Sequence, residues 1–337
     1  MNQKCYAGRA LCIISLSGIM LFPKSISLTT GSDPQYSQDG KSILLSANID
    51  DEPTIIKYSI DSHDIVRLTY GIRAYDGKFT RDGSKIYYVV ESKSREYTEI
   101  WTMGSNGLGK NKIIGSTNRY RRKPVYNQCN KTIYYIYSMN KSVGIGVVDE
   151  NGVNEMSFFG AGDLGINSLT VSPDCKSILY SSLVAIVSQH IQDGIKHYIT
   201  PWEKERYLFS DGYSYDYINF CLSSDGKNIY LHARKKGEYT KEHFFIQSYG
   251  QKETKEIGVV ESGMVYGISV SPDNKKIIFL IDDGSGYNYA WKILPLPRHK
   301  ERVKLLEMNI DGTGLHEIVL DPRKIIDSVK KNQQFIR

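Results

Sequence analysis

The histidines and the carboxylates near them are the side chains of this chain best suited to chemistry. The seven histidines are spread along the sequence without a shared spacing. His190, His197 and His232, with Asp193 and Glu203 near them in sequence, are the best candidates for a metal site or an acid–base cluster. Polar side chains in loops are more often simply solvated. The sequence therefore favours the absence of such a cluster, with a metal or acid–base site at these residues as the alternative.

Known catalytic motifs are missing from the sequence. It contains no Gly-x-Ser-x-Gly elbow, no His-Glu-x-x-His zinc helix and no phosphate-binding loop of the form Gly-x-x-x-x-Gly-Lys-Ser/Thr. His316 and Glu317 resemble the start of the zinc motif, but the second histidine does not follow. We therefore expect no catalytic residues, no cofactor and no bound metal, and we favour a protein that is not an enzyme.

A short sequence motif occurs six times in the chain. The fold that it predicts must position the candidate functional residues. Each copy has a bulky apolar residue, then a turn three positions later, then an isoleucine four positions after the turn and another bulky residue beyond it. The turns recur every 43 to 51 residues, and a period of this size is typical of stacked or radially arranged units. The six turns are Asp39-Gly40, Asp82-Gly83, Cys129-Asn130, Asp174-Cys175, Asp225-Gly226 and Asp273-Asn274.

The residues around each turn predict strands. Aromatic and β-branched residues stand at alternate positions, which is the side-chain period of a strand. Each unit continues with a second hairpin, and four short strands in about 45 residues form one blade of a propeller. The sequence therefore predicts an all-β fold, a six-bladed β-propeller of four-stranded blades. Cys175 predicts a distorted fourth turn, because Gly and Asn tolerate a positive φ better than Cys.

Two interpretations are open for the way in which the ring closes. Residues 28–31 read Leu-Thr-Thr-Gly and copy residues 68–71, Leu-Thr-Tyr-Gly, which end the first blade. Either an N-terminal strand joins the last blade, or the likeness is a coincidence and residues 307–320 complete that blade unaided. The basic tail, 322–337, is expected to be a short capping helix or a frayed end.

The N-terminal segment has the features of a secretory signal. Lys4 and Arg9 precede the apolar stretch 10–22, and Ser25 and Ser27 offer small residues for cleavage after Ser27. An uncleaved anchor is the alternative. Removing residues 1–27 takes away three cations and no acid, so the net charge of +6 falls to +3. We expect a periplasmic or secreted protein that does not bind nucleic acid and, once the signal is cleaved, has no stable membrane span.

Three cysteines remain after the signal, at positions 129, 175 and 221. Their number is odd and their spacing fits no metal motif, so no disulfide framework can be inferred. The sequence favours small residues that fill strands and turns.

Several phrases resemble a known repeat. Residues 172–178 and 271–277 read Ser-Pro-Asp-x-Lys and end in isoleucine, and Met308–Gly312 reads Met-Asn-Ile-Asp-Gly. They resemble the TolB-like (WD40-like) propeller repeat over residues 33–321. The resemblance implies the fold and leaves the function open, because such blades occur in the envelope protein TolB, in prolyl oligopeptidase-like peptidases and in some polysaccharide lyases.

The resemblance also sets the expected domains. These are a signal peptide, 1–27, a TolB-like propeller, 28–321, and a basic tail, 322–337. We expect neither the N-terminal domain of TolB nor the hydrolase domain of the peptidases, so membership of the Tol–Pal system is not expected.

Recognition by one face of the ring is the favoured function. The loops that lead into each inner strand, and those that join the two hairpins of a blade, open on the same face, which we call the loop face. Tyrosine and arginine anchor many interfaces. We expect a monomer that binds a protein partner in the cell envelope, or a glycan; the alternative is a carbohydrate-active enzyme of the polysaccharide lyase type. The expected binding residues are Arg73, Tyr75, Arg119, Tyr120, Arg121, Arg122, Tyr213, Tyr215, Tyr217, Tyr266, Tyr287, Tyr289 and Trp291.

Overall fold

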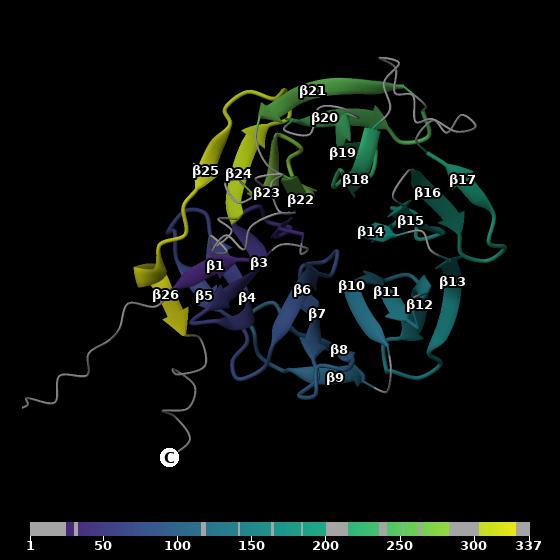
Figure 1. Ribbon diagram of the computed structural model, residues 1–337, viewed down its shortest axis with the longest axis horizontal. Coiled ribbons are helices and arrows are strands. Elements are labelled where there is room, and N and C mark those ends of the chain that lie inside the picture. Colours follow the sequence, from purple (N-terminus) through teal and green to yellow (C-terminus); the bar gives the residue numbers. More distant parts are fainter. Residues whose placement is uncertain are drawn as a thin grey trace, which may run out of the picture.

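The isoleucine of each repeat lies at the centre of a sheet. All six are fully buried, in strands that follow the repeat turns. A computed structural model describes residues 25–29, 33–115, 119–140, 142–162, 165–182, 185–199, 215–235, 241–251, 253–261, 264–282 and 303–327. In these parts the chain forms six sheets that follow one another around a central axis (Figure 1). The predicted six-bladed β-propeller is confirmed.

Five of the sheets are four-stranded antiparallel blades in chain order, with the first strand of each nearest the axis (Figure 1). The second blade has β6 (Ala74–Phe79), β7 (Lys85–Glu91), β8 (Thr98–Gly104) and β9 (Asn111–Ile114). The third has β10 (Tyr120–Asn127), β11 (Thr132–Met139), β12 (Ser142–Asp149) and β13 (Met156–Gly162). The fourth has β14 (Ile166–Val171), β15 (Ser177–Ser182), β16 (Ile186–His190) and β17 (Lys196–Tyr198). The fifth has β18 (Tyr215–Leu222), β19 (Asn228–Lys235), β20 (Lys241–Ser248) and β21 (Thr254–Glu261), and the sixth has β22 (Met264–Val270), β23 (Lys276–Asp282), β24 (Val303–Asn309) and β25 (His316–Ile318).

The first blade contains both ends of the described chain. Two short strands, β1 (Ile26–Leu28) and β2 (Gln35–Tyr36), both pair with β3 (Ser42–Ile49). β4 (Glu52–Ser59) and β5 (Ile65–Arg67) follow in the sheet. A turn of 3₁₀ helix (Pro322–Lys324) then brings β26 (Ile325–Asp327) parallel to β5. The blade therefore has six strands.

This arrangement decides between the two interpretations of ring closure. The N-terminal strand pairs with β3 of the first blade, so the prediction that it joins the last blade is wrong. The last blade is completed by β24 and β25, which lie within residues 303–318. Closure comes from the other end of the chain, because β26 leaves the sixth blade and pairs with the first. The tail thus starts with one turn of 3₁₀ helix followed by a strand, and Ile325 and Ile326 lie in that strand rather than in the expected capping helix.

The predicted signal peptide lies almost wholly outside the described residues. β1 begins at Ile26, so the predicted cleavage after Ser27 would remove two of its three residues. The described part of the chain contains no helix long and apolar enough to cross a membrane.

The core consists of one apolar cluster at each contact between neighbouring blades. Leu44 and Ile55 of the first blade pack with Tyr88 of the second, and Ile43 packs with Ile278 of the sixth. Each blade is therefore buried on both sides, which explains why its central strands are apolar at nearly every position. Burial of this kind keeps the strand ends around the axis in fixed positions.

The fourth turn is regular, and the prediction that Cys175 distorts it is wrong. Cys175 adopts a φ of 61°, close to the 69° of Gly40 and the 71° of Gly226. Asp174 accepts hydrogen bonds from the Ser172 hydroxyl and the Lys176 amide, as the aspartate of the other Ser-containing turns does. A left-handed conformation costs a residue with a side chain about 1 kcal/mol. In the third turn the positive φ falls instead on Lys131, at 54°.

Candidate functional site

The axis of the ring is lined by one equivalent position from each repeat. The residue six places before each turn lies at the start of an inner strand, where in β6, β10, β14, β18 and β22 the register shifts by a bulge. A bulge re-aims a side chain and is common beside functional sites. The six residues at this position are Asp33, Asp76, Lys123, Ser168, Asn219 and Gly267.

Charged side chains at this position, together with Lys78 two residues after Asp76, bind one another across the axis. The Asp33 carboxylate accepts from Lys123 Nζ at 2.9 Å and lies 3.0 Å from Lys78 Nζ, so blades one, two and three are tied together. Lys123 Nζ also donates to the carbonyl oxygen of Asn167 in the fourth blade, at 2.6 Å. The Asp76 carboxylate accepts from the Lys123 amide at 3.0 Å. The two lysines and two aspartates balance in charge.

The pairing fixes the protonation state of Asp33. Burial by itself would raise the pKa of this carboxyl group, but the ammonium groups of Lys123 and Lys78 outweigh it and hold the pKa far below its usual range. A carboxylate that stays ionised and has both oxygens bound is poorly suited to accept a proton near neutral pH. The cluster therefore acts as a structural tie across the axis.

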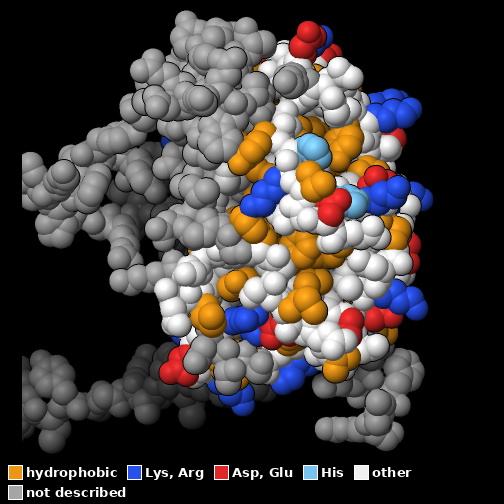
Figure 2. Space-filling view, turned by 90° about the vertical axis from the view of Figure 1, so that its right-hand side faces the viewer, with side chains coloured by type: hydrophobic (Ala, Val, Ile, Leu, Met, Phe, Trp, Pro, Cys, Tyr) orange, Lys and Arg blue, Asp and Glu red, His pale blue; other side chains and the backbone are white. Residues whose placement is uncertain are grey.

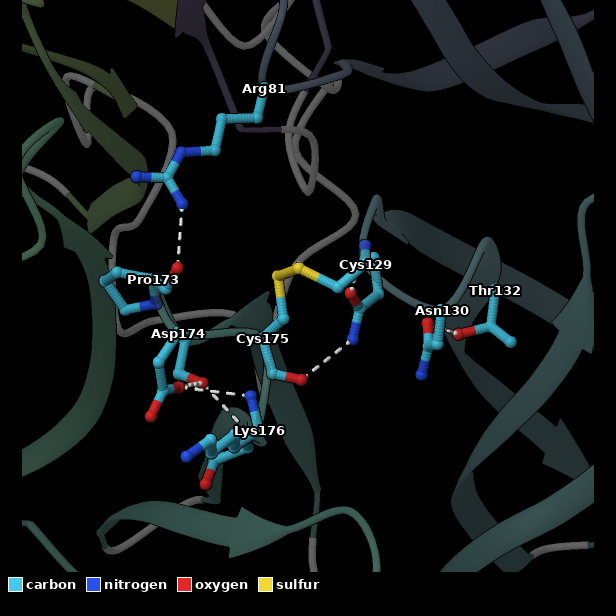
Figure 3. The surroundings of a disulfide bond; sticks show 11 residues. Arg81, Cys129, Asn130, Thr132, Pro173, Asp174, Cys175 and Lys176 are labelled. Carbon is cyan, nitrogen blue, oxygen red and sulfur yellow. Dashed lines mark hydrogen bonds between the residues drawn. A yellow bond between two sulfur atoms is a disulfide. The ribbon is translucent and has the colours of Figure 1, made fainter.

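A cavity of about 260 Å³ extends from this cluster to the face that carries the repeat turns, which we call the turn face. Asp33 and Lys78 line its inner part, and Arg81, Pro173 and Cys175 line it at the turns. The Arg81 guanidinium reaches across to the carbonyl oxygen of Pro173 at 2.9 Å (Figure 3). The lining is mainly polar, with hydroxyl and amide side chains from several blades.

A disulfide joins two blades at this cavity. Cys129 and Cys175, in the turns of the third and fourth blades, are bonded to each other, with their Cα atoms 6.1 Å apart (Figure 3). The interpretation of these two cysteines as small filling residues is therefore wrong. Cys221 is a free thiol that lines the same cavity, and burial raises its pKa to about 12. Such a thiol is a poor nucleophile at neutral pH.

The histidines proposed as a cluster do not meet. His190 lies at the end of β16 and His197 lies in β17, both at the outer rim of the fourth blade. His232 lies inside the fifth blade, where its Nδ1 is 3.3 Å from Glu242. His190 has Asp193 as its nearest carboxylate, at 3.0 Å, and Glu203 lies outside the described residues. The described residues contain no group of three His, Cys, Asp or Glu side chains that could hold a metal ion.

On the loop face, Tyr120 is the most exposed of the described candidate tyrosines. It is 38% exposed at the start of β10, and its hydroxyl donates to Glu91 at 3.1 Å and to the Arg95 carbonyl oxygen at 3.4 Å. Arg73 forms an ion pair with the same Glu91. Tyr75 lies beside this group, and burial, followed by the nearby Asp76 and Tyr120, raises its pKa. Three predicted residues of the second and third blades, Arg73, Tyr75 and Tyr120, thus lie close together. Glu91 lies beside them.

Two of the predicted arginines are not available on this surface. Arg121 is fully buried, and its Nε and Nη2 atoms donate to Glu155 Oε1 at 3.0 and 2.8 Å. Arg119 is mostly buried, with its guanidinium 4.9 Å from the centre of the Tyr137 ring. Arg122 is exposed and donates to the carbonyl oxygen of Ile166 at 3.0 Å. The alternation of strand β10 explains this split, because successive side chains point to opposite faces.

Of the remaining predicted binding residues, only Tyr266 is described together with its side chain. Tyr266 is half-buried and packs against the cluster between the sixth and first blades. Tyr215 and Tyr217 lie in β18, where the backbone alone is described. The residues that fall outside the described parts are Tyr213, Tyr287, Tyr289 and Trp291.

A second exposed surface lies on the outer rim of the third and fourth blades, which Figure 2 faces. Met156 at the start of β13 is 56% exposed, and Tyr198 in β17 is 48% exposed. Lys196 lies 3.3 Å from the centre of the Phe159 ring and covers part of this rim. Figure 2 shows hydrophobic side chains interspersed with charged ones rather than a smooth apolar face.

Comparison with known proteins gives structural likeness only. No family model matches the sequence, and no curated protein matches it. TolB from Acinetobacter baumannii superimposes with a TM-score of 0.59 at 16% identity, over 86% of this chain and 62% of that chain. An oligogalacturonate lyase in complex with manganese gives 0.59 at 10% identity, over 88% and 78%. A luciferin-regenerating enzyme gives 0.57 at 10% identity, over 88% and 98%.

Identities of this size show the fold and no more. A solved TolB structure is among the neighbours, in agreement with the resemblance of the repeat. The chain spans less than two thirds of the length of the Acinetobacter TolB structure.

Proposed function

We propose that this chain is an exported, non-catalytic propeller that binds a protein partner in the cell envelope through its loop face. The observation that carries the proposal is the exposed Tyr120, held by Glu91 and by the backbone of Arg95. A tyrosine fixed in this way loses little conformational freedom on binding, which is the property of an interface anchor. The disulfide supports export, because such bonds persist in oxidising compartments.

The charge around Tyr120 indicates the kind of partner. Lys93, Arg95 and Arg122 are exposed on the loops and strand ends of the second and third blades. The negative charge of Glu91 is offset by Arg73, and Glu96 is one further exposed acid in the loop that carries Lys93 and Arg95. Cations therefore outnumber acids around the tyrosine, and an acidic segment of the partner would complement them.

The arrangement of the titratable groups favours binding over catalysis. The charges on the axis are paired with one another, and the three histidines expected to cluster lie in separate places. A general base needs a group that can gain and lose its proton near the operating pH. Asp33 does not meet this requirement, because its pKa is strongly lowered.

The first experiment measures retention of envelope proteins by the immobilised full-length chain. We expect one protein to be retained, with retention reduced about tenfold or more by Tyr120→Ala combined with Arg122→Ala, as is typical for loss of an interface anchor. Tyr249→Ala is the matched control, because Tyr249 is 36% exposed and lies in a turn on the opposite face. A second control, Tyr198→Ala, tests the rim.

Two outcomes would contradict the proposal. Retention that is unchanged in the Tyr120 and Arg122 variant, or lost equally in the Tyr249 control, would remove the loop face as the binding surface. Retention lost only with Tyr198→Ala would move the surface to the rim.

The alternative function is a carbohydrate-active enzyme of the polysaccharide lyase type. An oligogalacturonate lyase has the same fold, and this likeness makes a lyase the enzyme class to test. An assay for unsaturated products from an acidic polysaccharide, with and without added manganese, tests it directly. Turnover that is lost on replacing a single histidine or tyrosine would establish the lyase in place of the binding protein.

A further inference from the structure

The axial cavity is lined by one equivalent residue from each of the six blades. In every blade this residue stands four places before the repeat turn, and its strand partner is the residue that follows the buried isoleucine. All six line the cavity. They therefore form one level of side chains around the axis, which we call the lining level. The six residues are Gln35, Lys78, Val125, Thr170, Cys221 and Ser269.

The lining level offers hydrogen-bonding groups and no carboxylate. The side-chain oxygen of Gln35 accepts from the Phe79 amide at 2.7 Å, so the NH₂ group of Gln35 remains available. The hydroxyl groups of Thr170 and Ser269 make no hydrogen bond to any other residue in the described parts of the chain. A polar ligand in the cavity can therefore bind to three blades at this level.

Arg81 adds a positive charge at the mouth of the cavity. The charged residues of the described lining are Asp33, Lys78 and Arg81. Both carboxylate oxygens of Asp33 are bound by ammonium groups, so this acid does not compete for Arg81. Arg81 is exposed, and its Nη1 atom donates to the carbonyl oxygen of Pro173 at 2.9 Å (Figure 3). The other N–H groups of the guanidinium remain for a ligand.

The aspartates of the repeat turns do not reverse this charge. Each of them accepts a hydrogen bond from a hydroxyl group of its own turn. A lysine follows each of them two or three residues later, and none of the five belongs to the described lining of the cavity. The charge of Arg81 is therefore the one that a molecule entering the cavity meets. The five aspartates are Asp39, Asp82, Asp174, Asp225 and Asp273.

We propose that the axial cavity binds a small organic acid that carries hydroxyl groups. The carboxylate of the acid pairs with Arg81, because a guanidinium can bind a carboxylate through two parallel N–H groups. The hydroxyl groups of the acid exchange hydrogen bonds with Gln35, Thr170 and Ser269. A volume of about 260 Å³ suits a molecule of monosaccharide size or smaller, since sites for larger ligands measure about 300 to 1,000 Å³.

The site lies on the turn face, so it does not depend on the partner proposed for the loop face. The test is isothermal titration calorimetry of the full-length chain with D-gluconate and with L-malate, at constant ionic strength so that screening stays the same. We expect at least one of the two acids to bind in a saturable manner, at one site per chain. Sorbitol has a hydroxymethyl group in place of the carboxylate of gluconate, and acetate lacks the hydroxyl groups. Each should bind at least about tenfold more weakly than the acid that binds.

Three variants locate the bound acid. Arg81→Gln should weaken its binding about tenfold or more, because a charge-assisted hydrogen bond is lost. Thr170→Val keeps the shape of the side chain and removes its hydroxyl group, so we expect binding that is about threefold to fivefold weaker. Lys41→Gln is the matched control, because it removes the same charge from an exposed position of the first turn that does not line the cavity. Its affinity should stay within about twofold of wild type.

Four outcomes would overturn the proposal. It fails if neither acid binds, or if sorbitol binds as tightly as gluconate. It also fails if Arg81→Gln and Lys41→Gln weaken binding equally, because the acid would then be attracted to the turn face as a whole. Binding that is weakened by Arg81→Gln and unchanged in Thr170→Val would place the acid outside the cavity. Retention of an envelope protein by the loop face is measured separately, so a failure here is distinguishable from a failure of the proposed function.

Discussion

The ion pair of Arg121 and Glu155 offers a demanding test of how this fold tolerates buried charge. The Arg121 side chain has no exposed surface, while 19% of the Glu155 side chain is exposed. The change Glu155→Gln keeps an oxygen at the end of the side chain and removes its negative charge. The guanidinium, which also donates to the Thr98 carbonyl oxygen at 2.9 Å, then stays buried and loses the negative charge of Glu155.

We expect Glu155→Gln to lower the free energy of unfolding by about 3 kcal/mol. Removing one partner of a buried pair costs about 3 to 5 kcal/mol, and the partial exposure of Glu155 favours the lower end of that range. The measurement is urea unfolding followed by circular dichroism and intrinsic fluorescence, with agreement of the two probes as the condition for a two-state treatment. Glu261→Gln is the control, because Glu261 is 82% exposed and 3.9 Å from Lys241, so its loss should change stability by less than about 0.5 kcal/mol.

A double variant distinguishes loss of charge balance from loss of packing. Arg121→Met together with Glu155→Gln removes the buried cation and keeps most of the side-chain volume, so we expect it to recover much of the lost stability. The reasoning is refuted if Glu155→Gln costs less than about 1 kcal/mol, the range of exposed pairs, or if the double variant is as unstable as the sum of its single changes.

Three further predictions concern the axis and the ends of the chain. Asp33 has a lowered pKa in the folded protein, so its contribution to stability is present above its unfolded pKa of about 3.9 and is lost as the pH falls below it. Asp33→Asn should therefore lower the urea midpoint at neutral pH and flatten its decrease between about pH 5 and pH 2; a parallel decrease in both proteins would contradict this. Ending the chain at Asp321 removes β26, and we expect faster hydrogen exchange in β5 with little change in β7 or β19, as mass spectrometry can show. The cysteines of the disulfide are 46 residues apart, so by the loop-entropy relation its reduction should lower the free energy of unfolding by about 4 kcal/mol. The midpoint of thermal unfolding, measured by calorimetry, should then fall by about 6 °C. A fall of less than about 1 °C would show that reduction gives the unfolded chain little additional conformational freedom.

The blades could be predicted because each repeat carries its own strand and turn signals. The isoleucine four places after each turn is buried on both sides by neighbouring blades, so the same residue type is required six times. Glycine or asparagine in the left-handed region marks four of the six turns. Local signals of this kind depend on the unit itself and are visible without knowledge of its neighbours.

Ring closure could not be predicted for a physical reason. β1 and β26 each have three residues, which carry too few side chains to specify a partner strand. The likeness of residues 28–31 to residues 68–71 reflects a shared local composition, and the partner of β1 is decided by its register with β3. The parallel pairing of β26 with β5 depends on where in space the chain leaves the sixth blade. No local sequence pattern specifies that position.

The disulfide and the charged tie on the axis were missed although the repeat contained a signal for both. Cys129 and Cys175 occupy corresponding turns of successive units, and corresponding turns of a propeller are neighbours around the axis. Likewise, the position six residues before each turn places Asp33 and Lys123 at the same level of the ring. Comparing the side chains at one repeat position across units would have predicted both contacts.

The tie on the axis and the surface around Tyr120 are connected through one strand. In β10, Lys123 is held by Asp33, Arg121 by Glu155, and Tyr120 lies at the exposed start of the strand. The buried cations fix the backbone from which the tyrosine projects, so that its position is determined before any partner arrives. A surface of this kind recognises a partner at a low cost in conformational entropy. It follows that Asp33→Asn, although remote from the loop face, should weaken partner binding through a faster dissociation rate, whereas loss of β26 should not.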